Sequence, residues 1–121
     1  MTLKVHHATK ALIFDLDGTL SDSLPVHLAT WNKIADKYGF VFDPQILLEM
    51  TGRPTIEFAI RVIEQYGISE KPEVLVKMKQ GSFWELAHLL KPIDKVVSIV
   101  KNYHGKIPMA VGTGASRTSA E

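Results

Sequence analysis

Two kinds of apolar pattern alternate along the chain. Residues 11–14 ("ALIF") and 108–111 ("PMAV") are short apolar runs, and each leads into a turn that contains glycine. Runs of this length are typical of strands buried on both faces, as in parallel sheets. We therefore expect two buried strands, one near each end of the chain.

Between these runs, apolar residues recur at helical spacing. The first predicted helix has Leu28, Trp31 and Ile34 on one face and stops before Gly39. Gly81 is expected to break the fourth helix, because glycine costs about 1 kcal/mol against alanine inside a helix. The pattern "TSAE" at the end of the chain is a capping box and predicts a further helix start. The five predicted helices cover about residues 23–38, 43–51, 55–66, 72–90 and 94–103.

The order of strand, helices and strand predicts an α/β protein. Two short parallel strands cannot cover their own edges and faces. On physical grounds, the chain is therefore expected to be the front part of a larger α/β protein.

Composition narrows the class of protein. The chain has 121 residues, a formal net charge of +1 and no cysteine. Disulfides and thiolate metal sites are thereby excluded, and the charge gives no reason to expect nucleic acid or a membrane as a partner. No run approaches the roughly 18 apolar residues of a membrane span, and the N-terminus lacks the apolar segment of a signal peptide. We expect a soluble, cytoplasmic protein.

The first strand ends in two acids. Asp15 and Asp17 belong to "DLDGT", at the end of the strand where α/β proteins bind ligands. One carboxylate could attack a phosphoryl group, and the other could donate and accept the proton. Two close carboxylates repel each other, so a hard cation such as Mg²⁺ is expected between them and the phosphate. The alternative is a simple turn, because Asp and Gly are common turn residues.

The second strand ends in "VGTGAS". Backbone N–H groups in such a turn point at an anion, and Thr113 adds a hydroxyl donor. An ordinary strand-to-helix turn explains the motif equally well. Its value lies in the pairing, because the two turns would lie side by side if the strands are parallel neighbours.

These motifs together resemble the haloacid dehalogenase superfamily. The longer string "DLDGTLSDSLPVHLATW" is similar to the subgroup of β-phosphoglucomutases and small sugar-phosphate phosphatases, and "PMAVGTGA" to its fructose-1-phosphate phosphatase branch. The resemblance implies a Rossmann-like parallel-sheet core, incomplete here, with an inserted α-helical bundle as a cap. Residues 1–20 and 91–121 would form part of the core, and residues 21–90 the cap.

The resemblance also implies roles for single residues. Asp15 would be the nucleophile and a Mg²⁺ ligand. Asp17 would be the general acid and base, with its backbone carbonyl as a second Mg²⁺ ligand. Thr113 and the N–H of Gly114 would hold the phosphate. The substrate would be a small phosphorylated sugar, and the cap would close over it and exclude water.

Two basic residues in the predicted cap are candidates for substrate contact. His27 lies in the first helix, where a hydrogen-bonded structural histidine is the alternative. Lys79, or Lys77 in its place, could reach the site from the fourth helix, although most lysines are solvated. Both tryptophans, Trp31 and Trp84, are expected to pack in the core or cap.

Two features decide between related activities. The cap arginine of β-phosphoglucomutases corresponds to Thr55 here, with Arg53 two residues earlier, which favours a phosphatase over a mutase. The lysine and the acidic pair that complete the family's site would fall after Glu121. Losing such groups typically costs several kcal/mol each in the transition state, so the isolated chain is expected to be a poor catalyst. The alternatives are a β-phosphoglucomutase-like phosphotransferase and a truncated chain without catalysis.

Overall fold

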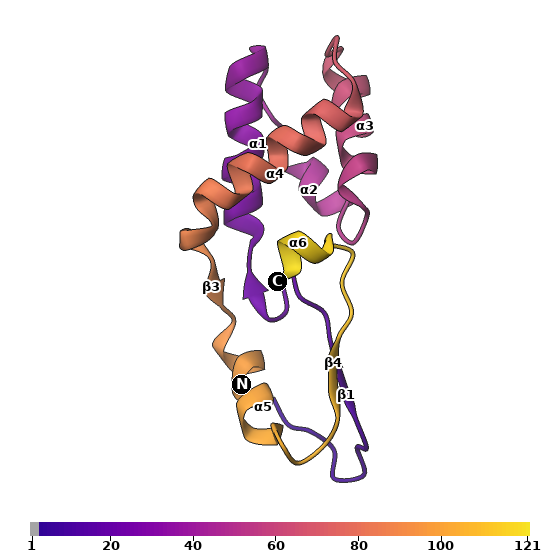
Figure 1. Ribbon diagram of the computed structural model, residues 1–121, viewed down its shortest axis with the longest axis vertical. Helices are drawn as coiled ribbons and strands as arrows, with labels where there is room; N and C mark the ends of the chain where they lie inside the picture. Colours follow the sequence, from indigo (N-terminus) through magenta and orange to yellow (C-terminus); the bar gives the residue numbers. More distant parts are fainter. Residues whose placement is uncertain (1–2) are drawn as a thin grey trace. The chain divides into compact units, whose positions relative to one another are not determined.

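The computed structural model of the protein describes residues 3–121, so the first two residues of the predicted core segment 1–20 lie outside the described part. The chain forms two compact units (Figure 1). The first comprises Met1–Ser23 and Leu90–Thr113, and the second comprises Leu24–Leu89 and Gly114–Glu121. The division into core and cap that the sequence suggested stays a prediction. The contacts within the chain group its last eight residues with the helices.

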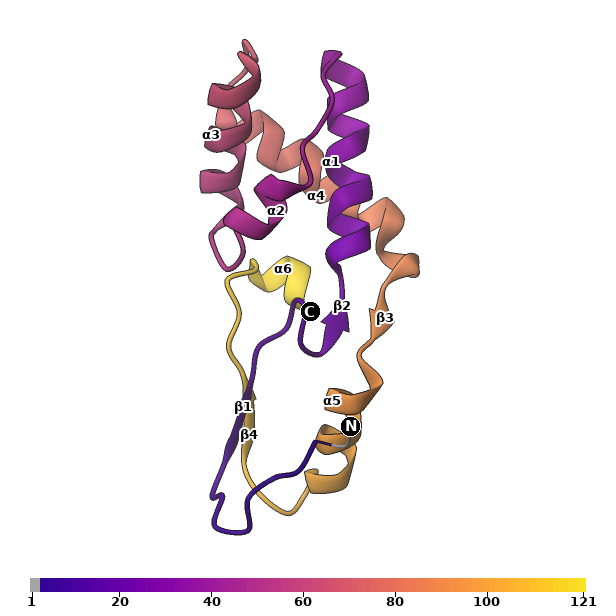
Figure 2. The same ribbon diagram turned by 180° about the vertical axis from the view of Figure 1, so that it is seen from behind.

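The first unit is built on the two predicted strands. β1 (Leu12–Phe14) and β4 (Met109–Val111) pair in parallel, with Leu12 opposite Met109 and Phe14 opposite Val111. Both views of the ribbon show them side by side (Figures 1 and 2). The α/β class and the parallel pairing are therefore confirmed.

A second, shorter pairing was not predicted. β2 (Ser21–Asp22) and β3 (Lys91–Pro92) are antiparallel, with Asp22 opposite Lys91. Their polar residues and the proline carry no strand pattern, so only tertiary contact brings them together. β3 leads into α5 (Asp94–Tyr103), which has the range predicted from the apolar spacing.

The second unit is helical. Gly81 lies inside an uninterrupted helix α4, so the expected break is wrong. That helix ends earlier than predicted, and a 3₁₀ turn, η1, continues the chain. The elements of this unit are α1 (Leu24–Tyr38), α2 (Gln45–Glu49), α3 (Thr55–Tyr66), α4 (Pro72–Leu86), η1 (Ala87–Leu89) and α6 (Arg117–Ala120).

The last helix begins before its predicted cap. The N-cap of α6 is Ser116, whose side chain accepts a hydrogen bond from the N–H of Ser119 at 3.2 Å. The predicted capping box started at Thr118, which lies inside the helix instead. Glu121, its second member, pairs with Arg117 at 2.8 Å.

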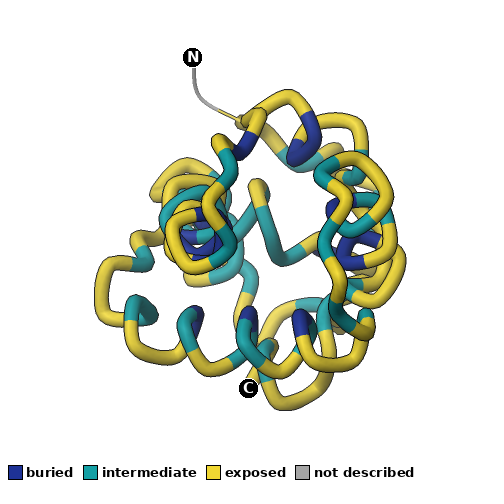
Figure 3. The backbone as a smooth tube through the Cα atoms, turned by 90° about the horizontal axis from the view of Figure 1, so that it is seen from above, coloured by how far each residue is buried: buried dark blue, intermediate teal, exposed yellow. Residues whose placement is uncertain are grey.

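The hydrophobic core belongs to the helical unit. Trp31 is 1% exposed and stacks on Phe58 and Phe42, with ring centroids 4.8 and 5.8 Å apart. Buried positions recur along the helices as short dark segments (Figure 3). In the first unit, by contrast, Ile13 is 80% exposed and Val111 is 53% exposed. The core cluster consists of Trp31, Ile34, Ala35, Phe42, Ile46, Leu47, Phe58, Ala59, Val62 and Leu75.

None of the helices within residues 3–121 has the length and apolar character that a membrane crossing requires.

Candidate functional site

The carboxyl ends of β1 and β4 meet at one edge of the parallel pair. Phe14 is the last residue of β1, and its carbonyl accepts a hydrogen bond from the N–H of Gly112 at 2.8 Å. Asp15 and Thr113 therefore follow directly on paired backbone. Both belong to the first unit. The starts of the two turns are therefore adjacent, as the sequence predicted for parallel neighbours.

The turn after Asp15 is held by backbone hydrogen bonds. The carbonyl of Leu16 accepts from the N–H groups of Thr19, Leu20 and Ser21 at 3.2, 2.9 and 3.1 Å. Gly18 has a φ of 77°, a left-handed conformation that glycine adopts without a steric cost. Asp15 is exposed, and its Oδ2 accepts from the Thr19 hydroxyl at 3.5 Å. The nucleophile candidate thus stands on a fixed turn with its carboxylate accessible.

Asp17 is bound by a residue that the sequence did not identify as functional. The hydroxyl of Ser23 donates to Asp17 Oδ1 at 2.6 Å, and Ser23 is only 2% exposed. No motif in the sequence connects Ser23 with Asp17. Only the turn between the two residues brings them together. A short bond from a buried donor restricts where the Asp17 carboxylate can point.

Thr113 and Gly114 follow β4 and Gly112 along the chain, and their role in holding a phosphate stays a prediction. Thr113 is exposed, so its hydroxyl is accessible. A side chain at Gly114 would place its Cβ 2.9 Å from the carbonyl oxygen of Gly52, closer than real Cβ contacts come. Glycine is therefore required at position 114 by space, which is compatible with a backbone N–H that approaches a ligand.

The helical unit brings His27 and Lys79 onto one aromatic ring. The His27 ring stacks on Phe83, with centroids 5.0 Å apart and an angle of 21° between the planes. Lys79 Nζ lies 4.8 Å from the centroid of the same ring. Lys79 is 9% exposed, which is unusual for lysine. The two candidates from α1 and α4 therefore contact the same ring, and the sequence did not point to Phe83.

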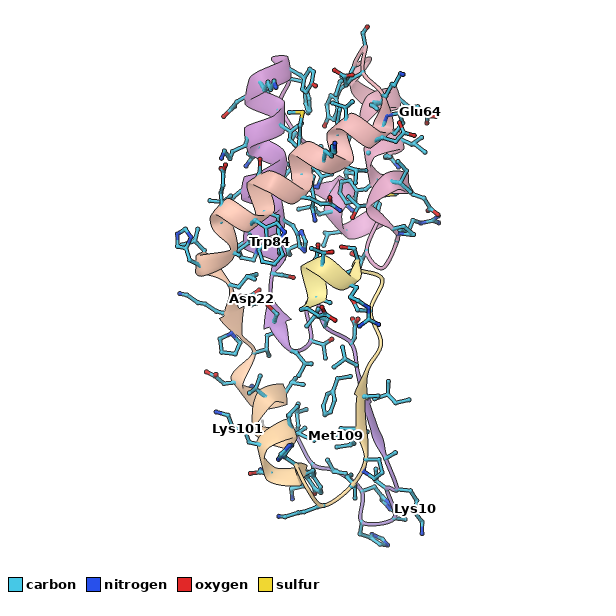
Figure 4. All side chains as sticks on the ribbon, viewed as in Figure 1. Lys10, Asp22, Glu64, Trp84, Lys101 and Met109 are labelled. Atoms are coloured by element: carbon cyan, nitrogen blue, oxygen red, sulfur yellow. The ribbon has the colours of Figure 1, made fainter. Side chains whose placement is uncertain are left out.

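The other cap candidates lie at the start of α3. Arg53 Nη1 pairs with Glu57 Oε2 at 3.1 Å, and both side chains are exposed. Thr55 is the first residue of the helix, after Pro54 as its N-cap. The tryptophans differ, because Trp31 is buried in the core as expected, whereas Trp84 is 48% exposed on α4 (Figure 4).

The described residues contain no cluster of metal-binding side chains. Within residues 3–121, no three His, Asp or Glu side chains group closely enough to hold a metal ion. The Mg²⁺ that the sequence suggested would have Asp15 and the backbone carbonyl of Asp17 as ligands here. Both are hard oxygen donors of the kind that Mg²⁺ prefers.

A family model matches most of the chain. The family model described as haloacid dehalogenase-like hydrolase matches residues 12–121, from the first residue of β1 to the end of the chain. The chain belongs to this family. The predicted resemblance to haloacid dehalogenase-like hydrolases is thereby confirmed.

Two relatives show which members are similar. The chain is 36% identical over 112 residues to the fructose-1-phosphate phosphatase YqaB of Escherichia coli K12, a match that covers 91% of this chain and 58% of that protein. It is 29% identical to the β-phosphoglucomutase of Bacillus subtilis, over 84% of this chain and 50% of that enzyme. The chain therefore spans about half the length of these haloacid dehalogenase-like relatives.

A solved structure supports the fold. A hydrolase from Pseudomonas syringae aligns with a TM-score of 0.75 over 93% of this chain and 53% of its own, at 20% identity. At that identity the likeness concerns the fold alone.

Proposed function

We propose that this haloacid dehalogenase-like chain carries part of the active site of a phosphatase that acts on small sugar phosphates through an aspartyl-phosphate. The observation that carries the proposal is the position of Asp15. It is exposed, it follows the last residue of β1, and the backbone next to it pairs with Gly112, one residue before Thr113. A nucleophile and a phosphate-binding hydroxyl are thus contributed by adjacent strand ends. The similarity to a fructose-1-phosphate phosphatase supports the substrate class.

The proposed reaction has two displacements at phosphorus. In the first, an Asp15 carboxylate oxygen attacks, the bond from phosphorus to the sugar oxygen breaks, and Asp17 gives its proton to that oxygen. In the second, Asp17 takes a proton from water, whose oxygen attacks the acyl phosphate and releases inorganic phosphate and free Asp15. Thr113 and the N–H of Gly114 donate hydrogen bonds to the phosphate oxygens. Asp17 ends the cycle protonated and ready for the next substrate.

Mg²⁺ is the proposed cofactor, with the Asp15 carboxylate and the Asp17 carbonyl as its ligands in this chain. When bound, it offsets the repulsion between the Asp15 carboxylate and the phosphate oxygens. The lysine and acidic pair that the resemblance places after Glu121 would complete this charge balance. Residues 1–121 alone are therefore expected to show little turnover. The helical unit would act as a cap that closes over the substrate, and the protein would be cytoplasmic.

The test is a panel of sugar phosphates offered to the full-length gene product with Mg²⁺ and with EDTA. We expect phosphate release that needs Mg²⁺, loss of activity in Asp15→Asn, and a phosphorylated peptide containing Asp15 after acid quenching. Asp36→Asn, on an exposed position of α1, is the matched control and should retain activity. An isomerised sugar phosphate without phosphate release would favour the mutase instead. No turnover of any sugar phosphate would contradict both.

A further inference from the structure

Phe83 is a buried aromatic residue whose surroundings differ from those of the three rings in the core cluster. It is 6% exposed, yet it lies outside the core cluster that contains Trp31, Phe42 and Phe58. Those three rings stack on one another. Phe83 instead contacts two basic side chains, the imidazole of His27 and the ammonium of Lys79.

The Phe83 ring can stabilise a positively charged group that has little contact with water. The face of an aromatic ring is negative and attracts a cation, and the attraction grows as the cation loses water. Lys79, at 9% exposure, has lost most of its water. His27 comes from α1, whereas Lys79 and Phe83 lie one turn apart on α4. One ring therefore fixes two basic groups from different helices with respect to each other.

We propose that Phe83 is a positioning residue, which holds Lys79 and His27 together as a pair for contact with the phosphorylated sugar. The proposal rests on the proposed function, because the substrate is what gives the pair its purpose. Phe83 itself does not touch the substrate. It acts through Lys79 and His27, by limiting the directions in which the ammonium and the imidazole can point.

The first experiment measures position without activity. In the 121-residue chain, Phe83→Leu keeps an apolar side chain but removes the ring, and Phe83→Tyr keeps the ring. Labelling of Lys79 by acetic anhydride, relative to Lys77, should rise about threefold to tenfold in Phe83→Leu, the range expected for losing a cation–π contact. Labelling should stay near the original rate in Phe83→Tyr. Phe42→Leu is the matched control, an aromatic-to-leucine change at a ring within the core cluster.

Folding is checked separately by circular dichroism, and Phe83→Tyr keeps the test valid if Phe83→Leu unfolds. In that case Phe83→Tyr should retain the original labelling of Lys79 and the original NMR shifts of the His27 ring. A labelling rate in Phe83→Leu that matches Phe42→Leu would overturn the proposal. So would loss of the His27 and Lys79 signatures in a folded Phe83→Tyr.

The second experiment is a double-mutant cycle in the full-length enzyme. Phe83→Leu should lower kcat/KM about tenfold, chiefly through KM, and should add little in a Lys79→Met background, because residues that act through one another are not additive. Additive losses would overturn the role of Phe83 while leaving the phosphatase proposal intact. Failure of the unaltered enzyme to turn over any sugar phosphate would instead overturn the proposed function and, with it, the substrate role of the pair.

Discussion

Ser23→Ala removes one hydroxyl at the point where the candidate acid/base is held. The hydroxyl donates at 2.6 Å to Asp17 Oδ1, and Ser23 is 2% exposed. Hydrogen bonds to charged groups contribute about 1.5–3 kcal/mol. Asp17 is partly exposed, so water can replace some of the lost interaction. We therefore expect a loss of about 1.5 kcal/mol in the free energy of unfolding, the lower end of that range.

The assay is urea unfolding followed by circular dichroism, with Ser98→Ala as the matched control. The Ser98 hydroxyl also makes a hydrogen bond, to the carbonyl of Lys95 at 2.9 Å, but it is exposed and its partner is uncharged. That control should change the free energy of unfolding by less than about 0.5 kcal/mol, as exposed substitutions usually do. Ser23→Thr should retain most of the stability, because it keeps the donor. Equal effects of Ser23→Ala and Ser98→Ala would refute the reasoning.

Three further predictions concern the helical unit. Leu75→Ala, at a position with 0% exposure in the core cluster, should lower the free energy of unfolding by about 2–5 kcal/mol in urea titrations; a loss below 1 kcal/mol would contradict the assigned core. Gly81→Ala should stabilise α4 by about 1 kcal/mol through helix propensity and so raise the melting temperature, since nothing lies within 4 Å of the added Cβ. Gly67→Ala should lower the melting temperature, because the φ of Gly67 is 63° and alanine is strained there. Shifts of the melting temperature in the same direction for both variants would contradict this reasoning. Burial, then the charge and hydrogen bond of Glu70, raise the pKa of Tyr38 above 10.0. The folded chain keeps that proton longer than the unfolded chain, so stability should fall as the pH rises above 10. Tyr38→Phe should show a smaller fall in urea titrations, and an identical fall would rule out this cause.

The secondary structure was largely predictable because its signals are local. The apolar runs before Asp15 and before Gly112 predicted the two strands, and the range of α3 was predicted to the residue. The β2–β3 pairing was not predictable, because Asp22 and Lys91 meet only through the fold. Gly81 misled the prediction since helix propensity is a weak preference that packing overrides.

The positions of the candidate site residues were predictable where short sequence motifs mark them. Asp15 and Thr113 could be placed at adjacent strand ends, because a parallel pair brings its carboxyl ends together. Ser23 and Phe83 could not be identified in this way. Ser23 is of interest because it contacts Asp17, and Phe83 because it contacts His27 on another helix. A lone serine or phenylalanine in the sequence does not indicate such a partner.

The short ribbon of β2 and β3 has a consequence for how this fold can vary. Ser21 pairs with Pro92 and Asp22 with Lys91, so the chain leaves the sheet unit and returns to it through neighbouring strands. Residues 24–89 are therefore joined to the first unit, which contains β1 and β4, through two ends that lie close together. An insert of a different length or architecture could be spliced in there without moving β1 or β4. The β2–β3 pair is thus a position at which the segment 24–89 could be exchanged for another, in evolution or by protein engineering.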